Sequence, residues 1–104
     1  MKNLARVTPA TIDVLRGLAG SGDPTWGLQI IKQSGRPAGT VYPILDRLER
    51  LEWVSSEWEL DDSRTGPRRR FYQLTAEGAP AAAAAIARFE ADLASVKFRV
   101  ARAF

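Results

Sequence analysis

Pro43 constrains the chain more than any other residue, because it limits where a helix can begin in the amphipathic stretch from residue 39 to residue 54. A proline inside a helix loses a backbone hydrogen bond and clashes with the preceding turn, which costs ~3 kcal/mol, but this cost nearly vanishes in the first turn. We therefore expect a helix over residues 39–51 that begins near Gly39 or Thr40, with Thr40 as its capping residue.

This helix would have two different faces. Apolar residues recur at intervals of three and four and form a stripe that would be buried: Val41, Ile44, Leu45, Leu48 and Leu51. The opposite stripe holds Thr40, Pro43, Arg47 and Arg50. The buried stripe indicates only that the helix packs, whereas an exposed stripe with two arginines could lie against a polyanion. The positive end of the helix dipole, at residues 36–43, suits phosphate or base edges.

Two further helices are expected before residue 39. Thr8 and Pro9 predict the start of a helix over residues 9–20, and the segment Gly20–Pro24 ends it. A second short helix, capped by Thr25, would end at Ser34 and Gly35. The short connection to residue 39 is typical of a helix-turn-helix, although any small three-helix bundle with a tight turn would look similar.

A β-hairpin is expected next. Residues 54–60 alternate, with Val54, Trp58 and Leu60 on one side and Ser55, Glu57 and Glu59 on the other. Residues 61–67 form the turn, and residues 68–74 form the returning strand, with Tyr72 and Leu74 on one face and Phe71 on the other. The arginines of this hairpin, Arg64, Arg68, Arg69 and Arg70, would bind phosphate; alternatively, Glu57 and Glu59 pair across the hairpin with Arg69 or a neighbour.

The carboxyl-terminal segment predicts one long helix that begins after Thr75, its capping residue. Apolar residues recur with a period of 3.5: Ala82, Ile86, Phe89, Leu93, Val96, Val100 and Ala103. We expect this seam to pack against the same helix of a second subunit through Ile86, Phe89, Leu93, Val96 and Val100. It could also fold back on the helix at residues 9–20, and both arrangements can hold along different parts of one helix.

Composition argues against an enzyme. The 104 residues include neither cysteine nor histidine, which removes thiolate and imidazole chemistry and the usual zinc ligands, so we expect no cofactor and no metal. Lysine and arginine number 15 against 12 acidic residues, a net charge of +3. No apolar run approaches the ~18 residues of a membrane span, and no secretion signal is evident, so we expect a cytoplasmic protein.

Three motifs resemble the PadR family of winged-helix transcriptional regulators. They are Gly39-Thr40-Val41-Tyr42-Pro43-Ile44-Leu45-Asp46-Arg47-Leu48-Glu49, the pair Trp58-Glu59, and Arg70-Phe71-Tyr72-Gln73-Leu74-Thr75-Ala76-Glu77-Gly78. The resemblance implies a mainly α fold with a small β-hairpin (α+β), namely a winged helix-turn-helix DNA-binding domain over residues 1–74 and a dimerisation helix over residues 75–104. One departure is Glu52, where such proteins usually carry glycine.

The resemblance also implies a homodimeric regulator that binds double-stranded DNA at a palindromic operator. Members of the short subfamily are repressors, so a repressor is expected. The recognition helix would be residues 39–51 and the wing residues 61–70. Some members of the subfamily release DNA when a small molecule occupies the dimer interface. The alternative is a winged-helix module that binds other proteins and leaves its arginines solvated.

The residues expected to contact DNA come from the recognition helix, the turn before it and the wing. They are Arg36, Thr40, Tyr42, Pro43, Arg47, Arg50, Arg64, Arg68, Arg69 and Arg70. Arg47 or Arg36 can offer a bidentate fork to guanine, and wing arginines can neutralise phosphate. Tyr42 is expected to lie partly in the core with its hydroxyl reaching a phosphate, and the three tryptophans are expected to be packing anchors.

Overall fold

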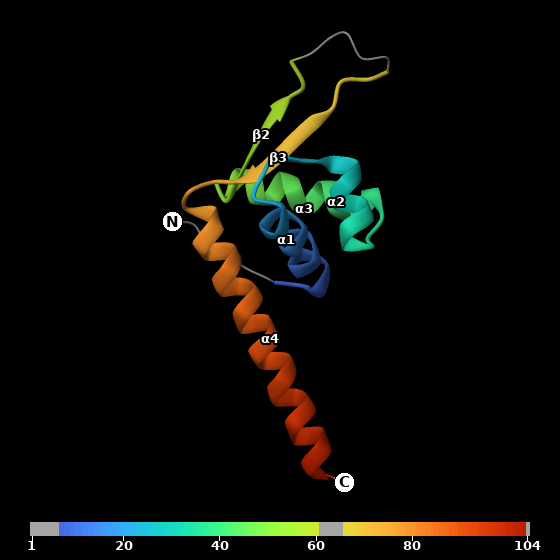
Figure 1. The fold of residues 1–104 in the computed structure, drawn as a ribbon. Coiled ribbons are helices and arrows are strands. Elements are labelled where there is room, and N and C mark those ends of the chain that lie inside the picture. The colour runs from blue at the N-terminus through green and yellow to red at the C-terminus, as the bar shows by residue number, and fades with distance from the viewer. Residues whose placement is uncertain (1–6, 61–65, 104) are drawn as a thin grey trace.

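Four helices and a small sheet make up the fold of the computed structural model, which describes residues 7–60 and 66–103. The elements in chain order are α1 (Pro9–Ser21), β1 (Thr25–Trp26), α2 (Gly27–Ser34), α3 (Ala38–Arg50), β2 (Val54–Trp58), β3 (Arg70–Leu74) and α4 (Gly78–Ala103). Helices α1, α2 and α3 form a compact bundle, and the β2–β3 hairpin and α4 extend from it in opposite directions (Figure 1). The molecule is elongated, with extents of 60 × 28 × 22 Å.

The first two helices have well-defined ends. The Thr8 side chain caps α1 by accepting a hydrogen bond from the backbone N–H of Thr11 at 3.2 Å, as the sequence predicts. Gly22 and Gly35 end α1 and α2 in the left-handed conformation, at φ of 69° and 70°. The predicted cap of α2 at Thr25 is wrong, because Thr25 lies in β1 and pairs with Tyr72 of β3, and Trp26 occupies the N-cap position.

Helix α3 starts slightly earlier than expected. Its N-cap is Pro37, so Thr40 is the third helical residue and not the cap. The backbone N–H of Thr40 instead donates to the Pro37 carbonyl at 2.9 Å. Pro43 therefore lies beyond the first turn and cannot donate to the carbonyl of Gly39, but Gly39 is exposed and water can satisfy that carbonyl.

Helix α3 ends in a Schellman motif that contains Glu52 where a glycine is usual. The backbone N–H of Trp53 donates to Leu48 and that of Glu52 donates to Glu49, both at 3.0 Å. Glu52 takes the left-handed position of this motif at φ 65°, the only non-glycine residue with positive φ in the described part of the chain. The missing glycine therefore changes the residue and not the geometry of the turn.

The junction between α3 and α4 is tight. The Thr75 hydroxyl donates to the Glu52 carbonyl at 2.7 Å and accepts the backbone N–H of Gly78 at 2.9 Å, which confirms Thr75 as the cap of α4. The backbone N–H of Thr75 also donates to the Trp53 carbonyl at 2.9 Å. A Cβ atom at Gly78 would lie 1.9 Å from the Trp53 carbonyl oxygen, so only glycine fits there.

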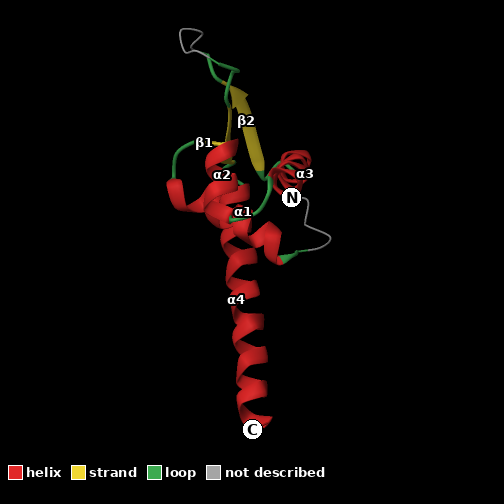
Figure 2. Ribbon diagram, turned by 90° about the vertical axis from the view of Figure 1, so that its right-hand side faces the viewer, coloured by secondary structure: helices red, strands yellow, loops and turns green. Residues whose placement is uncertain are grey.

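The sheet has the strand order β1-β3-β2, with all pairs antiparallel. Figure 2 shows the hairpin projecting beyond the helices, at the end opposite to the free end of α4. The predicted faces of the hairpin hold near its base, where Val54 and Tyr72 are buried. They fail toward its tip: Trp58 is 54% exposed, and Leu60 is 92% exposed and lies beyond β2, because the strands there extend past the core.

One hydrophobic core unites the three-helix bundle with the base of the hairpin. Its buried members come from every element of the bundle and include the stripe predicted for α3, with the exception of the half-buried Leu51. They are Ile12, Val14, Leu15, Leu18, Ile30, Val41, Ile44, Leu45, Leu48, Trp53, Val54, Tyr72 and Ala82.

Helix α4 has two parts. In its first part, Ala82 is buried and Ile86 and Phe89 pack against the core that α1 contributes to. From Glu90 to Ala101 every residue is exposed. The fold-back of the seam onto α1 therefore holds for the first part of α4, and the second part extends beyond the bundle. Of the four helices described, none combines the length and apolar character that crossing a bilayer requires.

Candidate nucleic-acid interface

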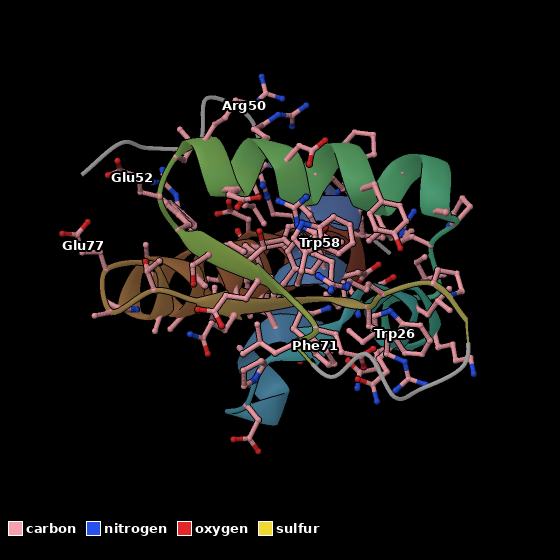
Figure 3. All side chains as sticks on the ribbon, turned by 90° about the horizontal axis from the view of Figure 1, so that it is seen from above. Trp26, Arg50, Glu52, Trp58, Phe71 and Glu77 are labelled. Carbon is pink, nitrogen blue, oxygen red and sulfur yellow. The ribbon has the colours of Figure 1, made fainter. Side chains whose placement is uncertain are left out.

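The outer face of α3 is open to solvent, as the sequence predicts. Pro43, Arg47 and Arg50 are exposed, and Thr40 is half-buried. Arg50 projects from the side of α3 that faces away from the hairpin and the core (Figure 3). Its Nε atom lies 3.4 Å from the backbone carbonyl of Asp46, so the guanidinium remains close to its own helix. This face can approach a DNA groove without any rearrangement of the core.

Tyr42 has the dual position that the sequence suggests. Its side chain is 38% exposed, yet its hydroxyl oxygen would lie only 2.7 Å from a Cβ atom built on Gly27. The absence of a side chain at Gly27 thus allows the Tyr42 ring to pack against the first turn of α2. The hydroxyl is held at the junction of α2 and α3, and its predicted contact with phosphate stays a prediction.

Arg36 is held by an acidic partner that the sequence analysis did not identify. Its Nε atom and one terminal nitrogen each lie 3.0 Å from Oδ2 of Asp13 on α1. Oδ1 of the same carboxylate lies 3.6 Å from Arg16, which in turn contacts Glu90 of α4 at 3.0 Å. This chain of ion pairs links the turn before α3 to α4, so Arg36 must leave Asp13 before it can reach DNA.

Arg70 connects the β2–β3 hairpin to α3. It donates to the Ser56 hydroxyl from Nε at 3.0 Å and from a terminal nitrogen at 2.8 Å, and it reaches Glu49 of α3 at 3.2 Å. The Ser56 hydroxyl donates to Glu49 at 2.6 Å. The guanidinium carbon also lies 5.3 Å from the centre of the Trp58 ring, within the range of a cation–π contact.

Trp58 therefore packs over the Arg70 guanidinium at the surface and, contrary to the prediction, is not a buried residue of the core. Trp53, in contrast, is buried as predicted. Figure 3 shows Trp58 on the α3 side of the hairpin and Trp26 and Phe71 toward its other side. There the guanidinium of Arg69 lies 4.0 Å from the centre of the Trp26 ring, and its buried Nε has no hydrogen-bond partner among the described residues.

The three consecutive arginines thus differ in their surroundings. Arg69 and Arg70 are half-buried against aromatic rings, and Arg68 is exposed. Arg64, at the tip of the wing, lies outside the described residues. The acidic partner of Arg70 is Glu49 of α3 and not a residue of the opposite strand, because Arg70 points to the face of the hairpin that covers α3.

Tyr72 lies beneath this network. Burial raises the pKa of its hydroxyl, and the Arg70 guanidinium partly offsets the shift by favouring the ionised form. Tyr42, Asp46 and Glu49 add to the increase in the pKa. The Tyr72 hydroxyl is therefore neutral at physiological pH and contributes no charge to the interface.

Comparisons with known proteins identify the family of this chain. The model of the transcriptional regulator PadR-like family matches residues 15–84, from the middle of α1 to the first turns of α4. The chain belongs to this family. PadR-like proteins are transcriptional regulators, and the four helices with a three-stranded antiparallel sheet form a winged helix with a long carboxyl-terminal helix.

Solved structures support the PadR-like assignment. A PadR-like transcription factor from Bacteroides fragilis shares 25% identity, with 90% of this chain and 88% of that chain covered and a TM-score of 0.61. A protein from Ralstonia eutropha proposed to bind DNA shares 26% identity over 75% of this chain and 95% of that chain, also with a TM-score of 0.61. The circadian clock associated protein Pex from Anabaena shares the fold, at 19% identity over 86% and 81% of the two chains and a TM-score of 0.64. The comparison with curated proteins gave no significant match.

Proposed function

We propose that the protein is a sequence-specific DNA-binding repressor that acts as a homodimer on a palindromic operator. In this proposal α3 is the recognition helix, and the hairpin is the wing that contacts the flanking backbone. The two copies of α3 would enter successive turns of the major groove, about 34 Å apart. The observation that carries the proposal is the exposed outer face of α3, which presents Arg47 and Arg50 away from the core.

The chemistry of this face suits direct readout of base edges. Arg47 is exposed, and its side chain forms no hydrogen bond, ion pair or ring contact with another described residue. Its guanidinium is therefore available for the bidentate contact that guanine O6 and N7 offer. Thr40, Tyr42 and Pro43 lie toward the start of α3, where backbone N–H groups and the helix dipole favour phosphate. Arg36, Arg50, Arg64 and Arg68 to Arg70 remain predicted contributors.

The exposed part of α4 supports the homodimer. Leu93, Val96 and Val100 recur on one face and are 45%, 49% and 53% exposed in the single chain. A stripe of this kind on an isolated helix buries its apolar area when two copies pack together. Ile86 and Phe89 pack against their own bundle and would contribute at the edge of such an interface. An effector site between the two copies of α4 is a further prediction.

The DNA-binding proposal is tested by fluorescence anisotropy on DNA that flanks the protein's own gene, at several salt concentrations. We expect Arg47→Ala to weaken binding to the preferred sequence by ~1 to 3 kcal/mol and to affect random DNA less. The matched control is Arg88→Ala, which removes the same charge from an exposed position on α4. No binding by the wild-type protein even at low salt would contradict the proposal and favour a module that binds proteins.

The dimer is tested separately by analytical ultracentrifugation. Val96→Glu places a charge in the middle of the seam and is expected to produce monomers that keep their helical content. The control is Ser95→Glu, which adds the same charge at an exposed position outside the seam and should leave the dimer intact. A wild-type protein that sediments as a monomer at micromolar concentration would contradict this part of the proposal.

A further inference from the structure

Asp46 lies in the middle of the exposed face of α3. Gly39, Pro43 and Arg50 are seven, three and four residues away, the spacings at which residues share one side of a helix, and all are exposed. Asp46 lies beside the stripe predicted from the sequence, which holds Thr40 and Arg47. A carboxylate at the centre of a surface for DNA needs an explanation, because it repels phosphate.

The Asp46 carboxylate forms no hydrogen bond and no ion pair with another described residue, although its charge helps to raise the pKa of Tyr72. Arg50 reaches only the backbone carbonyl of Asp46. Two other carboxylates near the interface are engaged: Glu49 binds Ser56 and Arg70, and Asp13 binds Arg36. Asp46 is therefore not part of the ion-pair networks that hold α3, and its carboxylate is available to a ligand.

The major groove offers few groups that a carboxylate can bind. Guanine N7 and O6, adenine N7 and thymine O4 are acceptors and repel it, whereas the amino groups of cytosine and adenine are donors. The adenine amino group lies next to the acceptor N7, an arrangement that suits an amide better than a carboxylate. Cytosine N4 is therefore the best match for a side chain that can only accept.

We propose that Asp46 is a specificity-determining residue that accepts a hydrogen bond from N4 of one cytosine in each half of the operator. This inference rests on the proposed function, because it requires α3 to lie in the major groove. Asp46 would act in two ways. It favours cytosine at one position, and it weakens binding to every other sequence because its charge then faces acceptors or phosphates without compensation. Arg47 and Arg50 on the same helix supply the attraction that this arrangement needs.

The test is selection from a randomised duplex library with the full-length protein, followed by binding titrations on the selected sequence and its single-base variants. The wild-type protein should prefer cytosine roughly tenfold at one position of each half-site. Asp46→Ala should lose that preference alone and bind other sequences more tightly. Asp46→Asn should shift the preference toward adenine, since an amide can pair with N6 and N7 together.

The matched control is Glu77→Gln, which removes one negative charge from an exposed residue. Figure 3 places Glu77 beside the start of α4, away from the outer face of α3. This variant should keep the wild-type base preferences. Thermal melting followed by circular dichroism checks that each variant is folded, as expected for changes at exposed positions.

The outcomes separate the inference from the proposed function. If the wild-type protein selects a sequence and Asp46→Ala selects the same one with the same preferences, the inference is wrong and the proposed function stands. An equal loss of binding to all sequences by a folded Asp46→Ala protein also overturns the inference. A wild-type protein that selects no sequence overturns the proposed function itself.

Discussion

The substitution Gly78→Ala tests how tightly the turn after α3 is joined to α4. The added Cβ would lie 1.9 Å from the Trp53 carbonyl oxygen and 2.7 Å from the Trp53 Cα, distances that no packed protein tolerates. The start of α4 must therefore move away from Trp53. This movement strains the hydrogen bonds that Thr75 makes to Glu52 and Trp53.

The expected loss of stability follows from these contacts. Overpacking against backbone atoms costs about 1 to 3 kcal/mol, and each weakened hydrogen bond adds about 1 kcal/mol, so we expect a total of about 3 kcal/mol or more. For a domain of this size, about 3 kcal/mol corresponds to a decrease in Tm of roughly 12 to 24 °C. Thermal unfolding followed by circular dichroism at a fixed protein concentration measures it.

The control is Gly20→Ala in α1, where a Cβ would meet nothing within 4 Å. This change should raise the stability by up to ~1 kcal/mol, because alanine favours the helix more than glycine does. A Gly78→Ala protein as stable as the wild type would refute the reasoning, since it would mean that α4 does not press against the turn after α3.

Three further predictions concern the turn, the wing and alkaline pH. Glu52→Gly should stabilise the protein by up to ~1 kcal/mol in urea denaturation because φ is 65° at this position, and Glu52→Ala should not. Glu49→Gln should cost about 1 kcal/mol by weakening the bond to the half-exposed Arg70, whereas the exposed Glu57→Gln should have no effect on stability. Equal losses of stability from the two substitutions would contradict the bracing of the wing. Burial raises the pKa of the Tyr72 hydroxyl, so the neutral hydroxyl contributes fully to stability below pH ~10, the pKa of an unfolded tyrosine. This contribution is lost as the pH rises through the folded-state pKa. Tyr72→Phe should therefore reduce the decline of the free energy of unfolding at alkaline pH.

Local sequence signals predicted most of the elements correctly. The Thr8 cap, the Gly35 stop and the apolar period of α3 place three helices within one or two residues of their observed positions. These signals work because caps, glycine stops and helical periodicity depend on residues a few positions apart. Thr75 and Gly78 at the start of α4 belong to the same class.

The errors arose where the outcome depends on distant residues. Thr25 looked like a helix cap, but its pairing with Tyr72 makes it part of a strand. The alternation that includes Trp58 gave the correct face of the hairpin but not the point at which the core ends. Such features depend on tertiary contacts that override local propensity.

In the candidate interface, too, features set by local sequence could be predicted and contacts between distant residues could not. The exposure of Arg47 and Arg50 follows from the helical period and could be predicted. The partners of Arg36 and Arg70, which are Asp13 and Glu49, lie 23 and 21 residues away in the chain, and no spacing rule connects them. These ion pairs became visible only in three dimensions, and they reduce the number of arginines that are available to DNA without rearrangement.

Hydroxyl-radical footprinting on the selected operator tests the central claim most directly, because it reports which sugars the protein covers on each strand. The account predicts two protected regions on one side of the duplex, related by a two-fold axis and about one helical turn apart, with weaker protection at both outer flanks from the wings. A single protected region without symmetry, or protection that follows no sequence, would contradict it.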